Sequence, residues 1–343
     1  MSKWQLSIFL PHETAEIATQ GCSRGSLLPA IVSGMSEPTA YLNGAWVPFS
    51  QATLSVADLG IVQAATVTEM IRTFGHQPFR VEQHLARLRG SLSKTGIADP
   101  ELVSSLPGVI DRIIRENAPL IPLGNDLGIV IVITAGIQPM YAGGSANTAT
   151  GPTICVHSFP LPFERWAEHY HTGVHLIVPS VRAMPSEVID PRIKYRSRLH
   201  WFLADGEVRS LDPSAMALLA DENGRLTETN SGNLILFNGR SLLTPQEDTV
   251  LAGISQDVIF ELAAAKGIER QQRDLHVEDV LNAAEAFVSS TSYCLLPVTS
   301  INNRPVGTGQ VGAMFQELIS DWSALVKTDI IRQAQQAARE RTT

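Results

Sequence analysis

Cysteine is scarce in this chain, since 343 residues contain only three. Cys22, Cys155 and Cys294 lie far apart, and no two of them have the Cys-x-x-Cys spacing. This pattern argues against a disulfide framework and against a zinc site made of thiolates. Reduced thiols, as in the cytoplasm, are therefore expected.

Long apolar runs and an excess of basic charge are also missing. No run approaches the roughly 20 apolar residues that a membrane-spanning helix needs, and the first residues lack the basic and apolar regions of a signal peptide. The formal net charge is −8, whereas a protein that binds nucleic acid usually presents a basic face. We expect a cytoplasmic protein that binds neither membranes nor nucleic acid.

Several nucleotide-binding and hydrolase motifs are absent as well. The chain has no Gly-x-x-x-x-Gly-Lys-Ser/Thr loop, no Gly-x-Gly-x-x-Gly after a strand and no Gly-x-Ser-x-Gly turn. P-loop kinases, Rossmann dehydrogenases and α/β-hydrolases therefore have no support in the sequence.

The patterns that are present predict an α+β protein with mixed sheets. Asn43-Gly44 between apolar residues predicts a hairpin, 67–74 and 128–134 read as strands, and the apolar spacing over 81–92 predicts a helix. Later residues give further strands with Asn-Gly turns, a helix over 253–268 that ends at a glycine, and a last amphipathic helix.

The length and a change in composition predict two domains. Hydrophobic residues make up 44% of the chain, and 343 residues exceed what one core usually holds. Pro160 and Pro162 mark a change in composition, and residues 161–166 are expected to form the loop between domains. We expect a loosely ordered extension over 1–38, a smaller α/β domain over 39–160 and a larger one over 167–343.

The segment 190–200 carries a base at every second position. These bases are Arg192, Lys194, Arg196, Arg198 and His200. A solvated basic strand, a stripe that reads phosphates and one reactive lysine among structural arginines all fit this pattern. Like charges and partial burial would lower the pKa of Lys194, and a neutral amine attacks aldehydes to form a Schiff base.

Two further features each allow an ordinary interpretation and a functional one. The amides of Ile254 and Ser255 begin a helix after Gly253, where unpaired N–H groups can bind an anion or only start the helix. His169, His171 and His175 could approach a zinc ion, but no acidic or cysteine partner has a suitable spacing. A surface loop is the better interpretation of the histidines, and no metal is expected.

The ordered set of motifs resembles the fold-type IV pyridoxal-phosphate enzymes. The set consists of HLARL (84–88), Lys194, LTETNSGNLILF (226–237), LLTP (242–245), VLAGIS (250–255) and FVSSTS (287–292). This family includes branched-chain and D-amino acid aminotransferases, amine transaminases and aminodeoxychorismate lyases. The resemblance runs from about Tyr41 to about Leu325. It implies two α/β domains with pyridoxal 5′-phosphate in the cleft between them, and a homodimer.

The resemblance also implies the roles of single residues. Lys194 matches the lysine that binds the cofactor aldehyde, and Glu228 matches the glutamate that pairs with the pyridine nitrogen. The residues that match donors to the cofactor phosphate are Arg87, Ile254, Ser255 and Thr291.

The chain departs from the family pattern at the substrate side. Thr68 replaces a pocket aromatic and Met70 follows on the same strand face, so this wall should be roomier or more polar. Residues 117–156 contain no Lys, Arg or His, so the carboxylate trap of D-amino acid aminotransferases is missing. Either Arg72, on the same face, holds the substrate carboxylate, or the substrate is an amine without one. Leu199 stands where branched-chain enzymes carry a tyrosine.

The activity implied by the resemblance is that of a transaminase. An amino group would move between an amino acid or amine and a keto acid or ketone by a ping-pong Schiff-base mechanism. The alternative is a lyase of the aminodeoxychorismate type, which releases pyruvate by β-elimination. A third interpretation, a non-catalytic scaffold, would leave the joint presence of Lys194, Arg87, Glu228 and Thr291 without a reason.

Overall fold

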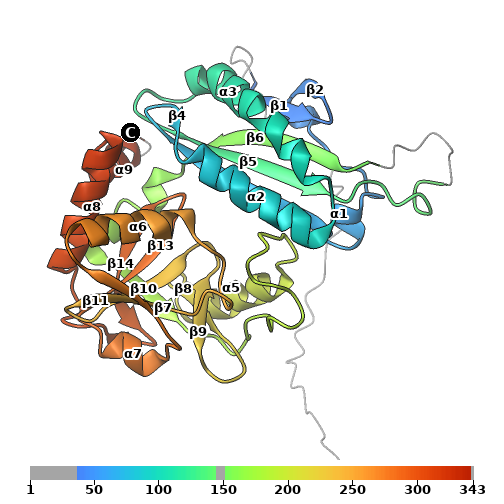
Figure 1. The fold of residues 1–343 in the computed structure, drawn as a ribbon. Helices are drawn as coiled ribbons and strands as arrows, with labels where there is room; N and C mark the ends of the chain where they lie inside the picture. The colour runs from blue at the N-terminus through green and yellow to red at the C-terminus, as the bar shows by residue number, and fades with distance from the viewer. Residues whose placement is uncertain (1–36, 144–150, 341–343) are drawn as a thin grey trace, which may run out of the picture. The chain divides into compact units, whose positions relative to one another are not determined.

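Two β-sheets with helices packed against them organise the chain in the computed structural model (Figure 1). The structure describes residues 37–143 and 151–340. The extension expected over 1–38 therefore lies almost wholly outside the described residues, as does part of the loop after residue 135.

The first sheet has six strands in the order β2-β1-β6-β5-β3-β4. Its strands are β1 (Thr39–Leu42), β2 (Ala45–Pro48), β3 (Thr66–Phe74), β4 (Gln77–Pro78), β5 (Leu127–Thr134) and β6 (Thr153–Pro160). Asn43 and Gly44 have φ angles of 49° and 89°, which confirms the predicted hairpin turn. Neighbouring strands of this sheet all run antiparallel.

Two helices, α2 (Val81–Thr95) and α3 (Leu106–Asn117), cover one face of the first sheet (Figure 1). Leu85, Leu88 and Leu92 of α2 are buried against Val67 and Ile71 of β3, which confirms the predicted apolar face of the helix. Side chains alternate along a strand, so Thr68 and Met70 project from the opposite face. That face is left for the functional site.

The second sheet has nine strands, with the order β12-β11-β10-β13-β14-β7-β8-β9 and β15 paired to β14. Its strands are β7 (Val174–Ile177), β8 (Met216–Ala220), β9 (Leu226–Thr229), β10 (Asn233–Phe237), β11 (Ser241–Thr244), β12 (Glu269–Gln272), β13 (Glu285–Ser290), β14 (Cys294–Ile301) and β15 (Arg304–Pro305). β7 pairs parallel with β8 and β14, and β11 pairs parallel with β12. Mixed pairing was expected of both sheets, but every strand pairing of the first sheet is antiparallel.

Helices α6 (Ile254–Ala265) and α8 (Ala313–Val326) pack together over β13 and β14 of the second sheet. Their buried residues Val258, Ile259, Phe315 and Trp322 belong to the same apolar core as Phe287 of β13. Helix α5 (Leu199–Leu211) packs against β8 instead, and α9 (Ile330–Glu340) packs against the turn η4 (Phe163–Arg165). The sequence patterns did not predict α3 or α9.

The remaining elements are short. They are α1 (Leu59–Val62), α4 (His169–Thr172), α7 (Val277–Leu281) and the 3-10 turns η1 (Phe49–Gln51), η2 (Pro100–Ser105) and η3 (Ala118–Leu120). Across residues 37–143 and 151–340, no helix has both the length and the apolar character needed to cross a membrane.

Candidate active site

A cavity of about 440 Å³ opens between residues of the two sheets. It gathers side chains from positions far apart in the sequence, on β3, α2, the 194–202 segment, β9, the start of α6 and the end of β13. The proposed site residues that line it are Thr68, Met70, Arg87, Lys194, Glu228, Ile254, Ser255 and Thr291. Of the proposed site residues, only Arg72 stands outside this lining.

The backbone around Lys194 is held by β3 of the first sheet. Tyr195 forms an antiparallel bridge with Val67. The amide of Thr68 donates to the carbonyl of Lys194 at 2.8 Å, and the amide of Arg196 donates to the carbonyl of Thr66 at 3.2 Å. This pairing places the lysine directly beside the strand face that carries Thr68.

The amine of Lys194 is kept partly neutral by its surroundings. Burial lowers the pKa of Lys194 to about 8, and the positive charges of Arg87 and Arg198 act in the same direction. The negative charges of Glu69 and Glu228 oppose this shift but do not cancel it. Because a neutral amine is both a nucleophile and a base, Lys194 has the properties expected of a reactive lysine.

Arg87 is fixed by a buried carboxylate that the sequence analysis did not single out. Its Nε donates to Oε2 of Glu69 at 2.9 Å, and its Nη2 donates to Oε1 at 2.7 Å. His84 Nδ1 lies 3.0 Å from the same Oε1. Burial alone would raise the pKa of Glu69, but the charge of Arg87 and the contacts with His84 outweigh it and hold that pKa well below its usual range.

Arg87 keeps donors free toward the cavity despite these contacts. A guanidinium carries five N–H donors, and Glu69 takes two of them. A third, from Nη1, donates to the carbonyl of Ala252 at 2.7 Å. Two N–H groups therefore remain for an anion, next to the residue that precedes the Gly253 cap of α6.

The start of helix α6 forms the same end of the cavity. Gly253 caps this helix, and a Cβ at this position would overlap Oδ1 of Asn233. The Nδ2 of Asn233 in turn donates to the carbonyl of Leu251 at 2.8 Å. The close approach requires glycine and turns the first amides of α6, with the Ser255 hydroxyl, toward the cavity, where they suit an anion.

Glu228 supplies a half-buried carboxylate on β9. Its Oε2 accepts a hydrogen bond from the amide of Leu251 at 3.3 Å. Burial raises the pKa of Glu228, although Leu251, Lys194 and Arg198 favour its charged form. A carboxylate in this setting can bind either a positive charge or a proton-bearing nitrogen.

Arg196 and Arg198 also line the cavity, although sequence reasoning assigned them no definite role. Nη2 of Arg196 lies 3.3 Å from Oγ1 of Thr68, which itself donates to the carbonyl of Ile131 at 2.8 Å. Nη2 of Arg198 donates to the backbone carbonyl and, at 2.7 Å, to Oδ1 of Asn230. Alternation along the segment was the only signal for them, and it did not separate lining residues from solvated ones.

Arg72 was predicted as a possible anchor for a substrate carboxylate, but its guanidinium turns away from the cavity lining. The residue is 2% exposed, and its guanidinium carbon lies 3.9 Å from the ring centroid of Phe74. Nη1 donates to the carbonyl of Ser292 at 3.0 Å and to Sγ of Cys294 at 2.9 Å. Arg72 therefore supports the turn that follows β13, because its long side chain extends past the strand face that Thr68 and Met70 share.

The three histidines noted in the sequence do not share one surface loop. His169 and His171 lie in the short helix α4, while His175 lies in β7 and contacts Asp212 at 2.9 Å. Within the two described stretches of chain, no group of three or more His, Cys, Asp or Glu side chains has an arrangement that could bind a metal ion.

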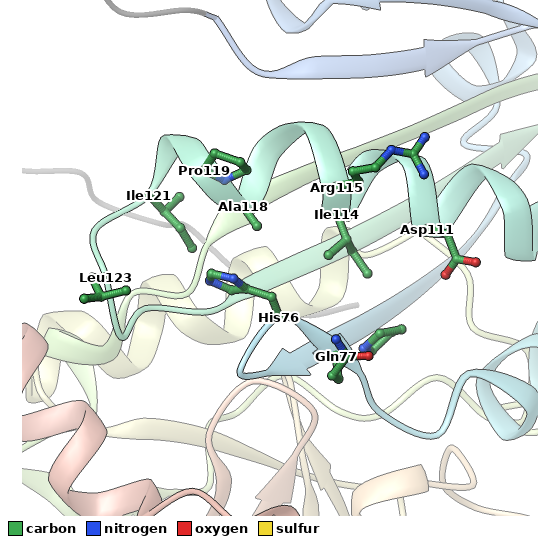
Figure 2. A pocket seen from close by; sticks show the side chains of 10 residues that line it. His76, Gln77, Asp111, Ile114, Arg115, Ala118, Pro119, Ile121 and Leu123 are labelled. Carbon is green, nitrogen blue, oxygen red and sulfur yellow. The ribbon is translucent and has the colours of Figure 1, made fainter.

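A second hollow, of about 630 Å³, lies between β4 and the end of α3 (Figure 2). Ile114, Pro119, Ile121 and Leu123 give it a largely apolar wall. Leu123 is 95% exposed, which marks this hollow as an open surface groove. It brings together neither a reactive amine nor a set of anion donors, so the 440 Å³ cavity is the candidate active site.

Comparison with known proteins gives a consistent result. The family model described as amino-transferase class IV matches residues 66–301. A protein of Methanocaldococcus jannaschii, named provisionally as a branched-chain-amino-acid aminotransferase, is 29% identical over 81% of this chain and 93% of its own. The D-alanine aminotransferase of Bacillus licheniformis is 24% identical over 79% of this chain and 91% of its own.

The fold has solved counterparts as well. The Escherichia coli branched-chain amino acid aminotransferase matches with a TM-score of 0.76 and 24% identity, over 85% of this chain and 95% of that chain. A branched-chain amino acid aminotransferase from T.th., solved with pyridoxamine 5′-phosphate, matches with a TM-score of 0.73 and 23% identity over the same shares. These matches confirm the α+β fold of the fold-type IV class. Because the family model covers more than half of the 343 residues, the chain belongs to the class IV aminotransferases and is a transaminase.

Proposed function

We propose that this transaminase works with pyridoxal 5′-phosphate and that the 440 Å³ cavity holds it. The proposal rests mainly on three features that share one cavity: a lysine with a pKa of about 8, a half-buried carboxylate and a helix start suited to an anion. Oγ of Ser289, which lines the same cavity, is buried without a hydrogen-bond partner among the described residues. These features fit a phosphorylated pyridine aldehyde.

The residues that would bind the phosphate lie at one end of the cavity. Arg87 contributes its two free N–H groups, and the start of α6 contributes the amides of Ile254 and Ser255. Thr291, after β13, adds a hydroxyl to the same cavity. A planar guanidinium and a helix start are both well suited to a phosphate group.

The roles of Lys194 and Glu228 follow from their ionisation. When bound, the cofactor supplies an aldehyde for reaction with amines and a pyridine ring that accepts electrons from the substrate carbon. Lys194 would bind the aldehyde while no substrate is present and, once displaced, would move a proton at the substrate Cα. Glu228 would pair with the pyridine nitrogen and keep a proton on it.

The chemistry that this arrangement supports is transfer of an amino group in two half-reactions. An amino acid or amine gives up its nitrogen first, and a keto acid or ketone receives it afterwards. Both substrates would depend on the one amine of Lys194, so they would bind in turn and give ping-pong kinetics. Thr68 and Met70 would form the wall on the substrate side, where Thr68 brings a hydroxyl into the cavity.

The test is an absorbance spectrum of the purified protein before and after borohydride, followed by mass mapping. Loss of a yellow band and a pyridoxyl group fixed on Lys194 would support the proposal. A protein that takes up no pyridoxal 5′-phosphate would refute it. Release of pyruvate from an aminodeoxychorismate-type substrate, with no added amino acceptor, would point to the lyase reaction instead.

We also propose that the protein is a cytoplasmic homodimer. In each copy, residues 39–160 and 167–343 would form two domains joined by 161–166, with 1–38 as an extension. Each sheet draws its strands from one of these halves, which supports the division. Large apolar side chains remain exposed near α1 and α5, including Ile61 at 58%, Leu199 at 70% and Leu203 at 52%. Burial of exposed apolar side chains commonly drives association. Light scattering on the purified protein, with Leu203→Glu as the disrupting variant, tests the dimer.

A further inference from the structure

Four cationic side chains line the cavity. Three of them have an ion-pair partner, a hydrogen-bond partner or the proposed role of reactive amine. Arg87 is paired with Glu69, and Lys194 is the reactive amine of the proposed function. Arg198 is held by Asn230, whose Nδ2 donates to Asp205. The fourth, Arg196, has no carboxylate partner among the residues that the structure describes.

Most donors of Arg196 are therefore unused. Its guanidinium carries five N–H groups, and its one side-chain hydrogen bond to a described residue joins Nη2 to Oγ1 of Thr68 at 3.3 Å. The contact with Thr68 fixes the direction of the side chain, across the face of the first sheet. The residue is exposed at the cavity, and partial desolvation together with the charge of Arg198 lowers the pKa of Arg196.

Arg196 and the reactive amine lie two residues apart, on either side of the residue that bridges to β3. The bridge between Val67 and Tyr195 puts Lys194 and Arg196 on one face, with Tyr195 on the other. Residues two apart are at most about 7 Å apart at their Cα atoms. A carboxylate two bonds from the nitrogen at Lys194 is within the reach of an arginine at that spacing.

Arg196 also stands apart from the donors proposed for phosphate. Those donors meet around Ala252 and Gly253, where Arg87 binds the backbone. Arg196 instead contacts Thr68 of β3, which is bonded to β5 through the carbonyl of Ile131. The cavity thus offers two separate places for anions, and the second one faces the substrate wall formed by Thr68 and Met70.

We infer that Arg196, oriented by the hydroxyl of Thr68, binds the carboxylate of the substrate and so selects α-amino acids and α-keto acids over plain amines. This role rests on the proposed function, because it takes Lys194 as the reacting amine. It replaces Arg72, which is buried against Phe74 and does not line the cavity. A planar guanidinium suits a carboxylate through two parallel hydrogen bonds.

Ligand binding to the protein loaded with pyridoxal 5′-phosphate tests this role without turnover. Calorimetry would compare 4-methylpentanoate with its neutral amide, on wild-type protein and on Arg196→Gln. We expect the acid to bind about 10- to 100-fold more weakly to the variant, since a hydrogen-bonded charge is lost, and the amide to bind equally to both. An unchanged affinity for the acid, or an equal loss for acid and amide, would overturn the role.

Two further variants make the result specific. Arg192→Gln removes an arginine of the same segment that is paired with Asp190 outside the cavity lining, and should leave both affinities unchanged. Arg196→Lys keeps the charge without the planar fork and should give an intermediate loss for the acid alone. If Arg198→Gln, rather than Arg196→Gln, abolished selective binding of the acid, the assignment to Arg196 would be wrong.

Half-reaction kinetics separate this inference from the proposed function. Racemic alanine and ethylamine differ only in the α-carboxylate, and each can be scored by the loss of the cofactor absorbance. Arg196→Gln should lower kcat/KM for alanine about 10- to 100-fold and leave that for ethylamine unchanged. If alanine, ethylamine and a broad panel of other amines all fail to react with wild-type protein, the proposed function fails. The calorimetry still decides the role of Arg196 in that case.

Discussion

Arg87 and Glu69 form a bidentate ion pair, with Nε to Oε2 at 2.9 Å and Nη2 to Oε1 at 2.7 Å. Glu69 is completely buried, and Arg87 is 10% exposed at its side chain. A charge left alone at such a place costs far more than one at the surface, because neither water nor a partner compensates it. The pair therefore holds Arg87 in position for an anion, and removal of either partner would leave the other charge uncompensated.

The first prediction is that Glu69→Gln destabilises the protein by about 3 kcal/mol, because Arg87 is left as a buried cation without a counter-ion. Urea unfolding of the apo-protein would measure this. The matched control is Glu261→Gln, which breaks the more exposed pair with Arg80 and should cost less than about 1 kcal/mol. Equal losses in the two variants would contradict the prediction.

The second prediction concerns the pH dependence of cofactor uptake. The pKa of Lys194 is lowered to about 8, so the amine is protonated and unreactive below that pH and becomes free above it. The rate at which apo-protein reacts with pyridoxal 5′-phosphate should rise with pH through a midpoint near 8, as stopped-flow absorbance would record. A midpoint near the ordinary lysine value of about 10.4 would show that burial and Arg87 do not act on this amine.

Much of the site can be traced to sequence signals, and the exceptions have physical reasons. The resemblance pointed to Lys194, Arg87 and Glu228, and all three line the same cavity. The buried position of Glu69 was not anticipated, since period-two alternation puts it on the helix-covered face where an apolar residue is the rule. The contacts of His84 and Arg87 with the Glu69 carboxylate are visible only in the folded structure.

Arg72 and Arg196 are further residues whose side-chain positions the sequence pattern does not predict. Both lie on strand-like segments, and alternation assigns each of them to the face that carries Thr68. Because an arginine side chain is long, its guanidinium can end far from its own Cα. Arg72 extends toward Ser292, and Arg196 extends to Thr68. Alternation predicts a face, but it does not predict where a long side chain ends.

The third prediction is a loss of stability in mild acid that depends on His84. Burial lowers the pKa of His84, and the charge of Glu69 opposes this without reversing it. The unfolded chain therefore binds a proton near pH 6.5 that the folded chain rejects, so stability falls as the pH drops below that value.

Urea unfolding at about pH 7 and about pH 5.5 would measure this effect. The free energy of unfolding should fall by about 1 kcal/mol more in wild-type protein than in His84→Gln, where no imidazole remains to be protonated. The same pH dependence in both proteins would place the acid sensitivity elsewhere.

The last prediction tests the close approach at the start of α6. A Cβ at Gly253 would overlap Oδ1 of Asn233, so Gly253→Ala must displace either Asn233 or the first turn of the helix. Because the amides of that turn are the proposed phosphate donors, we expect the Kd for pyridoxal 5′-phosphate to rise about 10- to 100-fold, corresponding to one or two charge-assisted hydrogen bonds.

Gly206→Ala in α5 is the matched control, since its Cβ would meet no atom within 4 Å. It should leave the Kd unchanged and raise helix stability by up to about 1 kcal/mol. Unchanged cofactor affinity in Gly253→Ala would mean that this helix start does not bind the phosphate, and the donors would then have to be sought around Arg87 and Thr291 alone.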